Sequence, residues 1–160
     1  MLQVLTIALT VSHAVSAAMW VGAVFMASLI DWPVIRSQTP RGQFPFGFLV
    51  AQGQRIFPWI YLAIVLLWVS GVGLVILHGP LDTAGWVLLA LKVVSLAFMT
   101  GSTVYGTLSS WPKIQFATDE EAFELYRVYL IRAYITFACG LVGVVAGTVL
   151  GRLSDWFITV

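Results

Sequence analysis

Cysteine and charge are both scarce in this chain of 160 residues. The single cysteine, Cys139, excludes a disulfide framework and a cluster of thiolate metal ligands. Charged residues make up 9% of the chain and the formal net charge is +1, so the sequence has no basic surface for nucleic acid. The motifs Gly-x-Ser-x-Gly and His-Glu-x-x-His are absent, which removes the sequence basis for a serine hydrolase or a zinc metalloprotease.

Hydrophobic residues, in contrast, make up 60% of the chain. They gather in four stretches of membrane-spanning length, at about 4–30, 59–78, 86–109 and 129–151. We therefore expect an all-α polytopic membrane protein, an antiparallel bundle of four transmembrane helices in one domain over residues 1–160. No Lys or Arg precedes the first stretch, and its apolar run continues past the small residues near Ser16. This favours a retained span over a cleaved signal peptide.

The basic residues indicate an orientation. The first connection carries Arg36, Arg41 and Arg55, and the third connection with the start of the fourth span carries Lys113, Arg127 and Arg132. The connection at 79–85 has no Lys or Arg, and the C-terminal end has only Arg152. By the positive-inside rule, the first and third connections are cytoplasmic and both termini lie outside. Arg55 and Arg132 are then most simply cytoplasmic anchors.

Two of these connections contain local signals. Residues 46–57 mix aromatic, aliphatic and polar side chains, which predicts an amphipathic segment at the cytoplasmic interface, and Pro58 suits the first turn of the second span. Thr118 and Glu121 form a capping-box pattern. The fourth helix is therefore expected to begin near Asp119, before it enters lipid.

Two ionisable residues stand out inside the spans. His13 lies in a first stretch without charged residues, and Lys92 lies in the third. Each is 18 residues before the end of its predicted span, at Asp31 and Ser110, which puts both about 27 Å above the cytoplasmic boundary. His78, at the outer end of the second span, is on the same side. An ionisable residue inside a span is a functional candidate by default.

The helical faces around these residues agree with a shared site. From Lys92, helical spacing gives a stripe of small and weakly polar residues: Ser95, Met99, Ser102 and Gly106. From His13, it gives Ser16, Ala17 and Trp20. Such stripes belong inside a bundle. We predict a cofactor-binding cavity lined by His13, Ser16, Lys92 and Ser95, with Trp20 and Met99 below it.

Several roles are open for these residues. His13 is an axial haem ligand, a metal ligand, a proton relay, or a neutral imidazole bonded to a neighbouring helix. Lys92 binds an anion such as a haem propionate or a substrate carboxylate, or it extends to the outer headgroups near Asp82. His78 is a solvated helix end, or a second haem ligand if it reaches inward. Met99 is a packing residue or a copper ligand.

Three glycines follow one another at four-residue spacing in the last span, at Gly143, Gly147 and Gly151. Such a face permits close helix contact. The contact is either within the bundle or across a homodimer or a larger membrane complex, and packing within the bundle is favoured.

The segment HAVSAAMWVG at 13–22 resembles the first span of the CopD-like copper-resistance membrane domain, and of the HemJ-type protoporphyrinogen oxidases. Arg55-Ile-Phe before the second span, and Trp86 followed by Lys92 in the third, are similar to the HemJ pattern. The HemJ resemblance implies a haem b site that uses His13, with Lys92 and Arg55 needed for catalysis. The CopD resemblance implies copper passage or loading. We expect a bacterial inner (cytoplasmic) membrane protein.

The sequence thus predicts an integral membrane redox or haem-handling protein, with haem b held by His13 near the outer face. One alternative is a copper-transport-associated permease in which His13 and Met99 ligate the metal. A second alternative is a cofactor-free accessory subunit that docks through its glycine face.

Overall fold

The computed structural model describes residues 1–78 and 80–153. Within these residues the chain consists of helices and short connections, without strands. The elements in order are α1 (Leu2–Phe25), the π-helical segment η1 (Met26–Asp31), α2 (Trp32–Gln38), α3 (Phe46–His78), α4 (Thr83–Tyr105), the π-helical segment η2 (Gly106–Ser110), α5 (Trp111–Gln115) and α6 (Asp119–Leu153). The predicted all-α class is confirmed.

The described residues contain four helices that are long and apolar enough to cross a membrane. They are Leu2–Gln38, Phe46–Leu77, Thr83–Gln115 and Asp119–Gly151. Large apolar side chains remain exposed along them, such as Val65, Val69 and Ile76 on α3. A soluble protein of this size buries such residues, so this surface is suited to lipid.

The first and third helices are longer than predicted. They continue beyond Asp31 and Ser110, through α2 and α5. The two positions that we predicted as helix ends are instead the last residues of η1 and η2. Each is followed by Trp-Pro, and proline is well tolerated in the first turn of the helix that resumes there.

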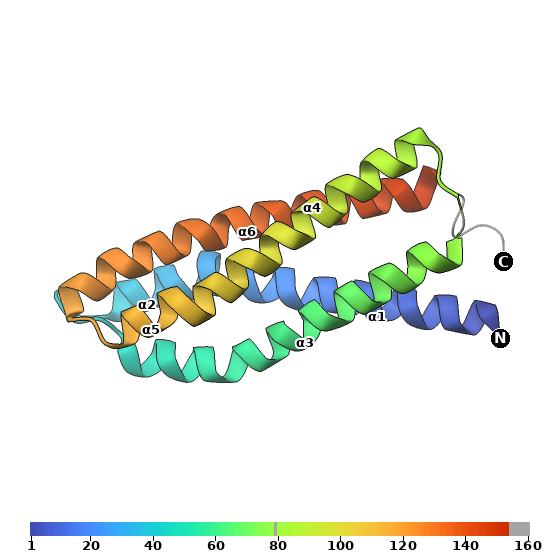
Figure 1. Cartoon of the computed structure of the whole chain (residues 1–160). Helices are drawn as coiled ribbons and strands as arrows, with labels where there is room; N and C mark the ends of the chain where they lie inside the picture. Colours follow the sequence, from blue (N-terminus) through green and yellow to red (C-terminus); the bar gives the residue numbers. More distant parts are fainter. Residues whose placement is uncertain (79, 154–160) are drawn as a thin grey trace.

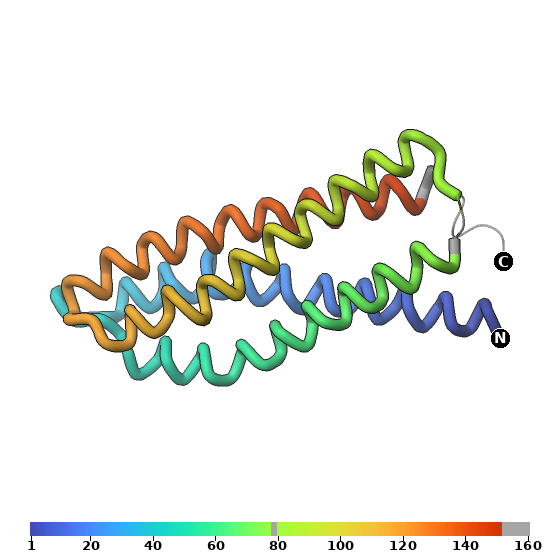
Figure 2. The backbone as a smooth tube through the Cα atoms, in the orientation of Figure 1, coloured from blue at the N-terminus to red at the C-terminus, as the bar shows by residue number. Residues whose placement is uncertain are grey.

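Figure 1 shows how the long helices lie. The start of α1, the end of α3, the start of α4 and the end of α6 lie at one end of the molecule, which we call the terminal end. The connections at 39–45 and 116–118 lie at the other, the loop end (Figure 2). α1 packs mainly against α3, and α4 mainly against α6, while α1 and α6 are also in contact. The molecule is therefore built from two helical hairpins.

The structure corrects the prediction for 46–57. These residues are not a separate segment, because α3 runs without a break from Phe46 to His78 with Pro58 inside it. Proline cannot donate the backbone hydrogen bond of a helix interior and typically bends the helix. Figure 1 shows α3 changing direction in its first half.

The predicted start of the fourth helix is confirmed. α6 begins at Asp119, and the Thr118 hydroxyl and backbone N–H both donate to the Glu121 carboxylate, at 3.0 and 3.1 Å. The Asp119 carboxylate also accepts a hydrogen bond of 2.9 Å from the backbone N–H of Phe44. This bond joins the first connection to the start of α6 at the loop end.

Two clusters of buried side chains fill the interior. The first is aromatic and lies around the loop-end connections, with Phe44, Trp111 and Tyr126 among its members. The second joins α1, α3 and α4 and has Trp20 and Met99 among its members. The side chains of His78 and Arg152 are outside the described part, so their predicted roles stay predictions.

Candidate functional site

The two hairpins share a pattern that our sequence analysis missed. Trp32-Pro33 and Trp111-Pro112 are 79 residues apart, and each follows a π-helical segment. His13 and Lys92 are also 79 residues apart. The repeated Trp-Pro dipeptide was the available sequence signal. Single π-helical turns are rare and occur frequently at functional sites, so a matched pair draws attention to this level of the bundle.

The side chains between these landmarks are buried at matching positions. Ser16 is 1% exposed and Ser95 is 7% exposed, each three residues after the ionisable residue of its helix. Trp20 at 0% and Met99 at 5% follow four residues later. The predicted inward faces of the first and third helices are therefore confirmed.

The His13 imidazole is held by α3. Its Nδ1 lies 2.9 Å from the Ser70 hydroxyl, which itself donates to the carbonyl of Leu66. Because that hydroxyl proton is already used, the serine oxygen accepts from an Nδ1–H. This leaves Nε2 as the ring nitrogen with a lone pair, which is the form that ligates metals.

Space for the imidazole is provided by Gly71. A Cβ atom at that position would lie 3.3 Å from Cε1 of His13. That distance is tighter than most real contacts, so the absence of a side chain here lets α3 approach the ring closely.

Lys92 is half-buried and lies beside a glycine of α6, as His13 lies beside Gly71 of α3. A Cβ atom on Gly147 would lie 3.0 Å from its Nζ. Lys92 is also near enough to His13 for a coulombic interaction between them. Each of the two ionisable residues that we predicted to share a site thus lies beside a glycine of its own hairpin.

The glycines of α6 have different surroundings. Gly147 faces Lys92 inside the bundle, whereas a Cβ atom on Gly143 would meet nothing within 4 Å. A third glycine, Gly140, has Val21 of α1 at 2.8 Å from the same idealised atom. Gly140 and Gly147 therefore pack within the bundle, and a docking face that includes Gly143 and Gly151 stays a prediction.

Arg55 is not part of this site. It is exposed and lies 15 residues before Ser70 on the same helix, which corresponds to about 22 Å. The catalytic role that the resemblance implied for Arg55 stays a prediction.

Two partly open cavities lie closer to the loop end than His13 and Lys92 do. The first, of about 70 Å³, is lined among others by Ala27 and Ser28 of η1, and the second, of about 60 Å³, by Gly106 and Thr107 of η2. The π-helical segments thus form part of the cavity walls. Neither cavity is lined by the four residues of our predicted cavity; Trp20 is the predicted site residue that reaches one of them.

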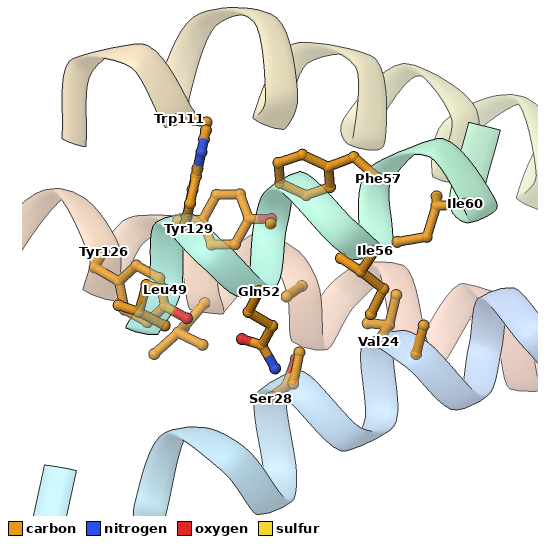
Figure 3. Close-up of a pocket in the computed structure, with 15 residues that line it drawn as sticks. Val24, Ser28, Leu49, Gln52, Ile56, Phe57, Ile60, Trp111, Tyr126 and Tyr129 are labelled. Carbon is orange, nitrogen blue, oxygen red and sulfur yellow. The ribbon is translucent and has the colours of Figure 1, made fainter. Parts of the chain in front are cut away.

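Figure 3 shows the first cavity, with the Gln52 side chain extending from α3 toward Ser28 on the first helix. The Gln52 amide nitrogen donates a hydrogen bond of 2.6 Å to the Asp31 carboxylate. The Ser28 hydroxyl, although 1% exposed, has no hydrogen-bond partner. A buried hydroxyl without a partner is costly, and a bound water molecule would satisfy it in a cavity of this size.

The residues present partly fit a haem. His13 offers an unprotonated Nε2 and Lys92 an ammonium group, which suit an iron and a propionate. Both described cavities are much smaller than the roughly 300 Å³ or more of ordinary ligand pockets, so neither accommodates a porphyrin. Among the side chains that the structure describes, no group of three or more His, Cys, Asp or Glu could hold a metal ion.

Comparison of the chain with protein-family models, with curated proteins and with solved structures found no match.

Proposed function

We propose that this chain is an integral membrane redox or haem-handling protein in which His13 holds the iron of a haem b. The observation that carries the proposal is the imidazole of His13, bonded to Ser70 through Nδ1 and within coulombic range of Lys92, in helices of membrane-spanning length. When bound, a haem b supplies one-electron chemistry.

The proposal gives each residue a separate task. Ser70 fixes the orientation of the imidazole, as second-shell partners of metal-bound histidines do. Lys92 attracts a carboxylate, either a propionate or that of an anionic substrate. The group lies at the level of His13 and Lys92, outside the two cavities nearer the loop end.

The proposed placement in the membrane follows the positive-inside rule. The four helices form an antiparallel bundle with both termini outside, and the loop end faces the cytoplasm of a bacterial inner membrane. The site is then near the outer face. This orientation is supported by the basic residues of the first and third connections.

Visible spectroscopy tests the proposal. The protein is purified in mild detergent, and spectra are recorded before and after reduction with dithionite. We expect a Soret band and reduced b-type bands that disappear in His13→Ala. The matched control is His78→Ala, the other histidine, which retains the Soret band if His13 alone is essential.

A colourless wild-type protein that stays colourless after haem addition would contradict the proposal. Copper bound by such a protein and lost in His13→Ala would favour the permease, whereas copurification of large partners without a chromophore would favour the accessory subunit.

A further inference from the structure

Arg132 on α6 has surroundings that a cytoplasmic anchor does not need. The side chain is half-buried. Its Nη1 donates a hydrogen bond of 2.9 Å to the Ser110 hydroxyl, and its guanidinium carbon lies 4.6 Å from the ring centroid of Tyr105. Both partners are neutral. Arg132 also lines the cavity of about 60 Å³ next to η2, whereas Ser110 and Tyr105 are not among its lining residues. A guanidinium in such a site attracts a negative charge.

Trp20 lines the same cavity and carries an unused donor. The side chain is 0% exposed, and its indole Nε1 has no hydrogen-bond partner. An indole nitrogen only donates, so what is missing beside it is an acceptor. Because native proteins pair nearly all buried polar groups, this donor points to a bound molecule.

The hydroxyl groups of the cavity add further donors. Thr136 donates to the Ser102 oxygen at 3.0 Å, which leaves the Ser102 proton available. Thr107 is already occupied by Tyr61 and by the carbonyl of Thr103. The described lining residues include no Asp or Glu. The cavity wall is therefore mostly apolar, and the polar side chains on it include donors but no carboxylate.

We propose that this cavity binds one small monovalent anion, a halide or a carboxylate of the size of formate, which accepts a hydrogen bond from the Trp20 indole and is attracted by the charge of Arg132. The volume sets the size of the ligand, since about 60 Å³ holds a few small molecules at most and excludes a lipid or a porphyrin. The site does not depend on the haem proposal, because Trp20 lies seven residues, about 10 Å along α1, from His13.

Nuclear magnetic resonance of the tryptophan indoles tests the site. The protein in detergent micelles is labelled with ¹⁵N-tryptophan, and the Trp20 signal is assigned with Trp20→Phe. Formate or chloride is titrated against gluconate, which is too large for the cavity, at constant ionic strength. We expect a saturable shift of the Trp20 signal with formate or chloride, and none with gluconate.

Two variants on α6 separate the site from general salt effects. Arg132→Gln removes the guanidinium, and we expect it to weaken binding at least tenfold. Arg127→Gln, which removes an exposed arginine of the same helix, leaves the affinity unchanged. If Arg132→Gln does not fold, Arg132→Lys keeps the charge without the planar donor group, and we expect weaker but measurable binding.

Three results would overturn the proposal: no anion-dependent shift of the Trp20 signal in the wild type, a shift only at molar concentrations, or equal affinity in Arg132→Gln and Arg127→Gln. The first would leave water as the occupant of the cavity.

Discussion

The hairpin of α1 and α3 and the hairpin of α4 and α6 have similar frames but different chemistry. Each has a π-helical segment before Trp-Pro, buried serines at matching positions, and a glycine beside the ionisable residue. The ionisable residue itself is His13 in one and Lys92 in the other. The residue before the glycine is Ser70 in the first hairpin and Ala146 in the second. The comparison teaches that the helix geometry and the small packing residues repeat between the hairpins, whereas the ionisable side chains do not.

The contact between the hairpins is the most sensitive point of this arrangement. A Cβ atom on Gly140 would overlap Val21 of the other hairpin at 2.8 Å, whereas Gly143 has open space. We expect Gly140→Leu to lower the free energy of unfolding by about 3 kcal/mol, because overpacking separates α6 from α1. Gly143→Leu, the matched control, should stay within about 1 kcal/mol of the wild type. Unfolding by SDS, followed by circular dichroism, measures both, and equal stability of the two variants would refute the contact.

Exchange of the two ionisable residues tests whether the hairpins are interchangeable. In the double variant His13→Lys, Lys92→His, the histidine would lie beside Gly147, where α6 has Ala146 in place of a serine. We expect haem affinity to fall by about 10- to 100-fold, up to about 2.7 kcal/mol, because the imidazole loses the partner that orients it. Titration with haem, followed at the Soret band, measures the loss. This prediction depends on the proposed function, and unchanged affinity would mean that Ser70 has no orienting role.

The loop end provides a smaller test of the link between hairpins. Asp119→Ala removes the acceptor of the Phe44 backbone N–H, and we expect a loss of about 2 kcal/mol, since hydrogen bonds to charged groups are among the stronger ones. Glu120→Ala, the neighbouring exposed carboxylate, should change stability by less than about 0.5 kcal/mol. Thermal unfolding in detergent compares them, and a similar loss in both would assign the effect to helix charge alone.

The smallest effect is expected within one hairpin. Thr118→Ala removes the hydroxyl that bonds Glu121 at the start of α6, which should cost about 1 kcal/mol. Thr148→Ala, whose hydroxyl bonds the carbonyl of Val144 on the exposed surface, is the control, with little change expected. Hydrogen exchange of the first turn of α6 should increase in Thr118→Ala alone. Unchanged exchange there would show that the capping box does not hold this end.

Much of this could be predicted from the sequence because lipid imposes simple rules. The number of long apolar helices, the start of α6 and the burial of Ser16, Trp20, Ser95 and Met99 follow from apolar length, capping and helical spacing. The ends of the first and third helices could not be predicted in this way, because polar residues such as Asp31 and Ser110 are paired inside the protein, with Gln52 and Arg132.

The partners of the candidate site were also beyond sequence patterns. That Ser70 would meet His13, or that Arg132 would turn toward Ser110, depends on how helices far apart in the chain rotate against one another. A polar stripe on one helix predicts which face of that helix points into the bundle, but it does not identify the residue on the neighbouring helix that this face contacts. Pro58 misled the prediction for a related reason, since packing of the preceding turns kept α3 continuous across it.

The equal spacing of the two hairpins also matters for what the chain can bring together. Two spans per hairpin mean that a second copy joined behind the first enters the membrane in the same sense, as in transporters with parallel repeats. In two separate, identical hairpins related by a two-fold axis, equivalent positions carry the same residue. A histidine of one copy would then correspond to a histidine of the other, and a lysine to a lysine. In this chain the matched positions hold different groups, His13 on α1 and Lys92 on α4, so that one molecule carries a base in one hairpin and a cation in the other.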